Sequence, residues 1–153
     1  MDLLSAAIGG LIIFILVVIR EWISQKKRFL GILRAEMEQN KEFLQSNRAK
    51  GKKLYFREDG WLAFRNQGGF RFIPSRLYSL LVKHYTILYE LNGLVKNFRG
   101  SEDQNLKEEI KEYEERFEGG LKCLQIEIEK ETHNWVWEKF KALIKKATRF
   151  MER

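Results

Sequence analysis

The stretch LLSAAIGGLIIFILVVI, from Leu3 to Ile19, contains seventeen consecutive residues without a charge. Together with the four residues that follow, it reaches about 20 residues, the length that an α-helix needs to cross a bilayer core roughly 30 Å thick. A single helix can cross a membrane because it satisfies its own backbone hydrogen bonds. We therefore predict a transmembrane anchor over residues 1–23 and a separate body over residues 24–153.

Charges on the two sides of this run indicate the orientation of the anchor. Only Asp2 and the amino terminus precede it, whereas Arg20, Lys26, Lys27 and Arg28 follow it closely. The cations on the C-terminal side predict a cytoplasmic body with the N-terminus outside. No basic stretch precedes the run and no small-x-small pair follows it. We therefore expect an uncleaved signal anchor, in a single-pass protein of the cytoplasmic (inner or plasma) membrane.

The composition of the body is typical of one helical domain. Of the 153 residues, 44% are hydrophobic and 32% are charged, which favours a globular chain over a disordered one. The single proline argues against an all-β protein rich in turns. The single cysteine, Cys123, excludes an internal disulfide and fits a reducing compartment. We predict an all-α protein in which a bundle of about four helices follows the anchor.

Two helices of this bundle carry seams of apolar residues spaced three and four apart, as in bundles and coiled coils. The first covers residues 24–47 and is expected to continue from the anchor without a break. Its seam includes one polar residue, Asn40. The second covers residues 75–99, and its seam includes His84, which we interpret as a core or interface histidine.

Two further helices complete the expected bundle. Residues 102–132 carry a narrow apolar stripe on an otherwise acidic helix. We expect this helix to be kinked at the glycine pair 119–120, because glycine disfavours the helix interior. Residues 134–152 predict an amphipathic helix with a basic face, which would either complete the bundle or lie on the membrane.

Residues 48–74 are the irregular part of the body, and they leave two local structures open. Asp59-Gly60 can form the turn of a hairpin between two aromatic-rich runs. Alternatively, Asp59 caps a short helix from Gly60 to Gln67, which stops at a glycine pair and places Trp61 and Phe64 on one face. We favour the short helix.

Several short motifs of the first 95 residues share a pattern. They are Glu36-Met-Glu-Gln-Asn40, the isolated Trp61, Ile73-Pro74, and Tyr85-Thr-Ile-Leu-Tyr-Glu-Leu-Asn92. In this pattern the chain resembles a loose group of uncharacterised bacterial proteins, each with one N-terminal span and a helical body. The resemblance implies an architecture, a membrane-anchored helical protein, and no particular chemistry.

Polar residues of these motifs are the best candidates for a special site: Glu36, Asn40, Trp61, Tyr85 and Asn92. Buried polar groups need hydrogen-bond partners, and a satisfied network can specify one packing of the helices. We hypothesise that some of these residues meet inside the bundle. Since Asn40 lies in an apolar seam, we expect Asn40→Leu to change the oligomeric state or specificity.

Catalytic and metal-binding patterns are absent from the sequence. Two histidines and one cysteine are too few for a zinc site with the usual spacings, and there is no phosphate-binding loop. We therefore expect no enzymatic activity and no cofactor.

Three functions remain. The first is a membrane-tethered scaffold or regulatory protein that binds a protein partner, or itself, through helix seams. The second is a self-assembling effector that perturbs membranes, because small residues in the span can pair helices. The third is a nucleic-acid-binding module based on the basic, aromatic segment 48–76, although the mixed charge of the body favours lipid contact or core packing there. Expected membrane-surface contacts are Lys26, Lys27, Arg28, Trp137, Lys141 and Lys145.

Overall fold

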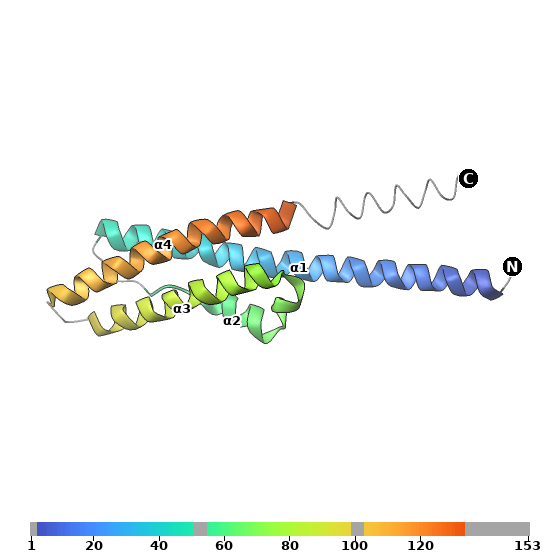
Figure 1. Ribbon diagram of the computed structural model, residues 1–153, viewed down its shortest axis with the longest axis horizontal. Helices are drawn as coiled ribbons and strands as arrows, with labels where there is room; N and C mark the ends of the chain where they lie inside the picture. The colour runs from blue at the N-terminus through green and yellow to red at the C-terminus, as the bar shows by residue number, and fades with distance from the viewer. Residues whose placement is uncertain (1–2, 51–54, 99–102, 134–153) are drawn as a thin grey trace.

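The computed structural model describes residues 3–50, 55–98 and 103–133, and this part of the chain is all-α (Figure 1). It contains four α-helices and one short 3-10 helix, η1, and no strand. In chain order these are α1 (Leu3–Lys50), α2 (Asp59–Asn66), η1 (Gly69–Phe72), α3 (Ser75–Phe98) and α4 (Gln104–His133). The predicted fold class, a long apolar N-terminal helix followed by a helical bundle, is confirmed.

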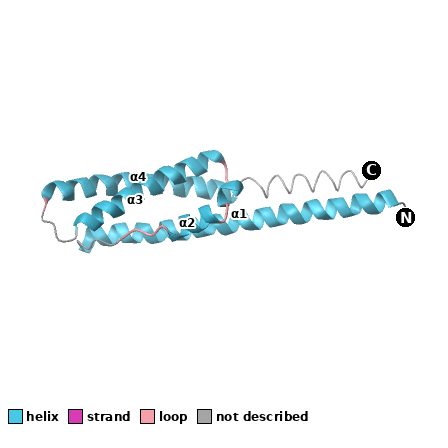
Figure 2. Ribbon diagram, turned by 90° about the horizontal axis from the view of Figure 1, so that it is seen from below, coloured by secondary structure: helices cyan, strands magenta, loops and turns pink. Residues whose placement is uncertain are grey.

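The helix α1 has two halves in different surroundings. Among the described residues, its N-terminal half projects from the bundle, whereas its C-terminal half lies alongside α2, α3 and α4 (Figures 1 and 2). The projecting half has exposed apolar side chains, including Leu11, Phe14 and Val17, all more than half exposed. In the described residues, only α1 contains a stretch long and apolar enough to cross a membrane.

The core of the bundle is made by one face of each long helix. On α1 the seam that contains Asn40 is buried, and its other residues are Leu30, Leu33, Met37 and Leu44. The buried apolar residues of the other two helices are Leu77, Leu81, Leu88, Leu91 and Val95 on α3, and Ile110, Phe117, Leu121, Leu124 and Ile128 on α4. Because the members of each set are three, four or seven residues apart, each helix has one buried stripe and an exposed remainder.

The segment between α1 and α3 forms the short helix rather than the hairpin. Residues 55–58 have no regular secondary structure, and α2 then begins at Asp59, with Glu58 as its N-cap residue. The expectation that Asp59 itself caps the helix is therefore wrong by one residue. Trp61 and Phe64 are both buried on the same face of α2.

Two glycines make the sharp turn from α2 to η1 possible. Gly68 adopts a left-handed conformation with φ of 71°, which favours glycine. Gly69 follows directly against Phe64, where a Cβ atom would overlap the phenyl ring. The turn therefore folds η1 back toward α1, where Phe72 packs against Phe29 with ring centroids 5.6 Å apart.

The glycine pair does not interrupt the acidic helix, and the kink expected there stays a prediction. α4 is one continuous helix through Gly119 and Gly120. The second of these glycines serves close packing, since a Cβ atom at Gly120 would lie 2.8 Å from Nδ1 of His84 on α3. Packing of Phe117, Leu121 and Leu124 in the core stabilises the helix on both sides of the pair. The expected helix 134–152 lies outside the described residues.

Candidate functional site

A buried carboxylate, that of Glu36, joins three elements of the bundle. It accepts hydrogen bonds from the backbone N–H groups of Gly60 and Trp61, the latter at 3.2 Å, and from the Tyr85 hydroxyl at 2.5 Å. The first two donors belong to the first turn of α2, whose own N-cap residue makes no side-chain capping bond. Glu36 on α1 therefore does the capping instead, at the helix end that favours negative charge.

This burial changes the acidity of both side chains of the pair. Burial raises the pKa of Glu36 above its ordinary value, although its three hydrogen bonds act in the opposite direction. Burial likewise raises the pKa of Tyr85, and the neighbouring Glu36 carboxylate raises it further. Tyr85 thus stays a neutral hydrogen-bond donor across the physiological range, and Glu36 is the acceptor.

Two asparagines hold the extended segment that leads into α2. Asn92 on α3 accepts from the Phe56 N–H at 2.9 Å and donates to the Phe56 carbonyl at 3.0 Å. Asn40 on α1 pairs in the same way with the N–H and carbonyl of Arg57, at 2.6 and 2.8 Å. Consecutive residues of an extended chain present their N–H and C=O groups to opposite edges. The two amides therefore make the backbone hydrogen bonds that adjacent β-strands would make in a sheet, one amide on each edge of the segment.

Aromatic stacking continues the site from the carboxylate toward the surface. The Trp61 indole stacks on the Tyr85 ring, with centroids 4.7 Å apart and planes 4° apart. The Arg65 guanidinium lies 5.8 Å from the centroid of the indole. Trp61 is only 5% exposed, so most of its surface is covered by these neighbours and by the core.

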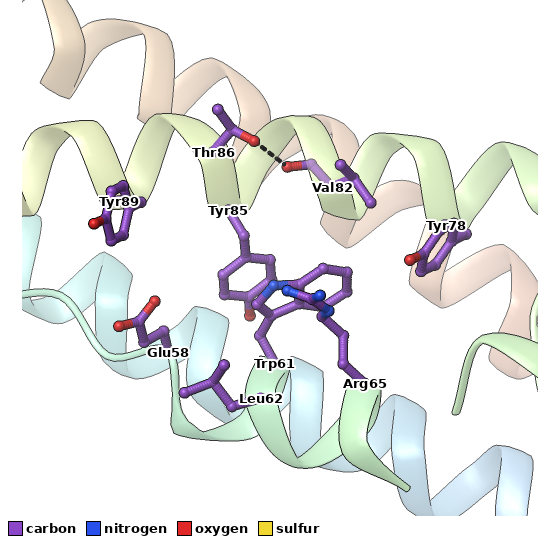
Figure 3. Close-up of a pocket in the computed structure, with 9 residues that line it drawn as sticks. All are labelled: Glu58, Trp61, Leu62, Arg65, Tyr78, Val82, Tyr85, Thr86 and Tyr89. Carbon is purple, nitrogen blue, oxygen red and sulfur yellow. Dashed lines mark hydrogen bonds between the residues drawn. The ribbon is translucent and has the colours of Figure 1, made fainter. Parts of the chain in front are cut away.

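An open groove between α2 and α3 lies above this stack (Figure 3). It has a volume of about 490 Å³, and its floor is the Trp61–Tyr85 pair. Along its length Figure 3 shows Glu58 and Tyr89 at one end, Tyr78 at the other, and Arg65 extending over Trp61 between them. Three apolar or aromatic residues of the groove are substantially exposed: Tyr89 at 71%, Leu62 at 42% and Val82 at 39%.

The structure places the five residues of the expected polar cluster in two arrangements. Glu36, Trp61 and Tyr85 meet in one buried network. Asn40 and Asn92 do not join it, since each holds backbone groups of the 56–57 segment instead. In this arrangement the amide of Asn40 is engaged within its own chain, so the stability of the fold is the property that it most directly supports.

Several residues of the site had no signal in the sequence. The backbone groups that Glu36 and the asparagines bind are invisible to side-chain patterns, because every residue has them. Gly60 had a signal that reads as a turn, yet it lies in the first turn of α2, where a Cβ atom would come within 3.0 Å of Glu36. Tyr78 and Tyr89 lie eleven residues apart on α3, and the sequence predicts only that both belong to a helix.

The expected membrane-surface residues divide into three groups. Lys27 and Arg28 are exposed on α1. Lys26 differs from the expectation of an exposed cation. It is 5% exposed, and its ammonium lies 2.6 Å from a carboxylate oxygen of Glu131 on α4. Its position on the helix turns it toward α4 and away from the surface. The other three residues, Trp137, Lys141 and Lys145, lie outside the described residues.

Residues that could hold a metal do not gather in the described part of the chain, where no group of three or more histidine, cysteine or acidic side chains is suitably placed. Comparison of the chain with protein-family models, with curated proteins and with solved structures finds no match.

Proposed function

We propose that this protein is a single-span, membrane-tethered scaffold whose cytoplasmic bundle binds a protein partner in the groove between α2 and α3. The observation that carries the proposal is the continuity of α1. One helix of 48 residues holds an exposed apolar half and a half that is built into the bundle. A bundle attached in this way is held at a fixed height on the membrane, which is what a tethered scaffold requires.

Exposed apolar side chains in the first half of α1 support the membrane anchor. A soluble protein rarely exposes a large continuous apolar surface, so this one needs a cover. The length of the run fits a bilayer core. The cations that follow the run, including Lys27 and Arg28, support a cytoplasmic body.

The composition of the groove supports a protein partner. Protein interfaces are enriched in tyrosine, tryptophan and arginine, and their energetically important residues are aromatic anchors in pockets. The groove combines Trp61, Tyr85 and Arg65 with the exposed Tyr89 and Leu62. An apolar segment of a partner, seated above the Trp61–Tyr85 pair, would cover the exposed side chains of Tyr89, Leu62 and Val82.

Site-specific crosslinking in cells tests the proposal. A photoreactive phenylalanine analogue replaces Tyr89 in the groove, and in a matched control it replaces Lys107 on the exposed face of α4. We expect the Tyr89 probe in the membrane fraction to give one discrete adduct with another protein, and the Lys107 probe to give none. Equal adducts from both positions, or a protein that leaves the membrane with a carbonate wash, would contradict the proposal.

A second outcome would favour the self-assembling effector. Crosslinks only between copies of the chain, together with growth arrest and dye entry on overexpression, would move the function from the groove to the span. There, no atom of the described residues lies within 4 Å of where a Cβ atom of Gly9 or Gly10 would be, so a second helix could approach closely.

A further inference from the structure

The corner formed by η1 and the start of α3 lies at the end of the bundle from which the apolar half of α1 projects (Figure 1). Two contacts with α1 hold it there. The Phe72 ring lies 6.2 Å from the Trp22 ring, measured between centroids, and Arg28 donates a hydrogen bond to the Gln67 side chain just before η1. The corner is therefore fixed to α1 at the level of residues 22–28.

This level coincides with the headgroup layer if the apolar run spans a bilayer. Trp22 is three residues past Ile19, the last residue of the uncharged run, which is about 4.5 Å along the helix axis. The headgroup region of each leaflet extends roughly 5–8 Å beyond the hydrocarbon. Phe72 contacts both Trp22 and Phe29, which lies about 15 Å past the run, so the corner begins in the headgroup layer and extends to its aqueous side.

Side chains at the corner have the chemistry that this layer selects. A hollow of about 410 Å³ is lined by Trp22, Phe72, Ile73 and Pro74, together with Arg71 and the Lys26–Glu131 pair. Lys26 is neutralised by Glu131, so Arg71 is the cation of this hollow that is exposed. Aromatic rings beside cationic side chains are typical of membrane–water interfaces.

The residue before Arg71 extends the apolar part of the surface. Phe70 is 45% exposed, and the Arg71 guanidinium lies 5.7 Å from the centroid of its ring. On the neighbouring face of α1, Arg20, Lys27 and Arg28 are exposed at the same end of the bundle, and Glu21 is the exposed acid among them. The surface that faces the expected headgroups is therefore basic with an apolar tip.

We infer that this corner is a lipid-binding site: Arg71 binds the phosphate of an anionic phospholipid, and Phe70 enters the interface beside it. The inference rests on the proposed membrane anchor and adds a second point of contact to it. With the span alone, the bundle could tilt about the end of the anchor. With Phe70 and Arg71 seated in the headgroups, its groove is presented at one angle to the membrane.

Nitroxide labels on the full-length chain in nanodiscs test this inference. On a Cys123→Ser background, single cysteines replace Phe70 at the corner, Ile13 in the span and Lys107 at the far end of the bundle. All three positions are exposed, so the labels leave the core intact. The measured quantity is the ratio of accessibility to oxygen, which enters lipid, over accessibility to a water-soluble nickel complex. The discs contain phosphatidylcholine alone or in equal parts with phosphatidylglycerol.

We expect a high ratio for Ile13, a low ratio for Lys107, and an intermediate ratio for Phe70 that rises severalfold in the anionic discs. Arg71→Gln should abolish this rise, whereas Arg57→Gln, which removes an exposed arginine elsewhere on the bundle, should leave it unchanged. A Phe70 ratio equal to that of Lys107 in both discs, with Ile13 in lipid, would overturn the inference and leave the anchor standing. An Ile13 label in water would overturn both.

Discussion

Apolar side chains before Arg20 lie exposed all around α1, whereas those after Gln25 are confined to one buried face of the same helix. The first half fits a cover that is equally apolar on every side, such as the bilayer proposed above. The second half needs specific neighbours, and α2, α3 and α4 provide them. The arrangement of the apolar residues, on all faces or on one face, thus distinguishes a helix suited to a lipid environment from one that packs against protein.

The largest test of this comparison uses one phenylalanine from each half. Phe29 is 2% exposed, between the rings of Phe64 and Phe72, whereas Phe14 is 64% exposed. Phe29→Ala should lower the free energy of unfolding of the bundle by about 4 kcal/mol, because a large buried side chain is removed and a cavity remains. Phe14→Ala should leave it unchanged.

The measurement is chemical unfolding of the full-length chain in detergent micelles, followed by tryptophan fluorescence. Equal losses for the two variants would mean that the halves of α1 are not energetically distinct.

The next effect concerns the polar residue that the bundle half buries. Glu36→Leu should lower the free energy of unfolding by about 3 kcal/mol, because it leaves the donors of Gly60, Trp61 and Tyr85 without their acceptor. Glu42→Leu, at an exposed position of the same helix, is the control and should change little. An unaffected midpoint in the Glu36 variant would show that the capping of α2 by α1 contributes nothing.

Much of the fold follows from side-chain patterns, and most of the site does not. The seams on α1 and α3 delimit buried faces because apolar burial acts on side chains at regular spacing. The conformation of residues 55–61 depends instead on where Glu36, Asn40 and Asn92 find backbone partners, which requires the helices to be packed first. Glycine shows the same limit: Gly120 reads as a helix breaker, but close packing against His84 explains it within a continuous helix.

The buried imidazole makes the bundle, and not the span, sensitive to acid. His84 is 2% exposed, and burial lowers its pKa from 6.5 to about 4. The unfolded chain then binds a proton more tightly than the folded one, so stability is lost as the pH falls from 6.5 toward 4. The difference corresponds to about 3 kcal/mol.

His84→Leu should flatten this dependence, as measured by unfolding midpoints across that pH range. The raised pKa of Glu36 acts in the opposite direction, because its stabilising effect is complete at low pH and is lost as the pH rises through the folded-state pKa. Glu36→Gln therefore should steepen the loss of stability in acid. Retention of the chain in membranes should not change over the same range, since the uncharged run has no group that titrates there. An unchanged acid dependence in His84→Leu would assign the effect to other groups.

The smallest expected effect distinguishes two roles of Asn40, in the association of chains and in the stability of the fold. In an apolar seam, an asparagine is expected to set the register or the number of helices that associate. In the structure, its amide is hydrogen-bonded to the N–H and carbonyl of Arg57 in the same chain. Asn40→Leu should therefore cost about 1–2 kcal/mol of stability, because two hydrogen bonds are lost at a segment that water can partly reach, and should leave the oligomeric state unchanged.

Asn92→Leu is the matched variant, since it removes the equivalent pair of bonds to Phe56 from the opposite edge. Because both amides hold one continuous segment, the double variant should lose less than the sum of the single losses: once one edge is released, the other has less order to maintain. Light scattering in micelles and unfolding midpoints measure the two properties separately. A changed oligomeric state in Asn40→Leu alone would show that Asn40 contributes to an interface between chains. The bundle half of α1 would then make contacts beyond its own chain, as is proposed for the span.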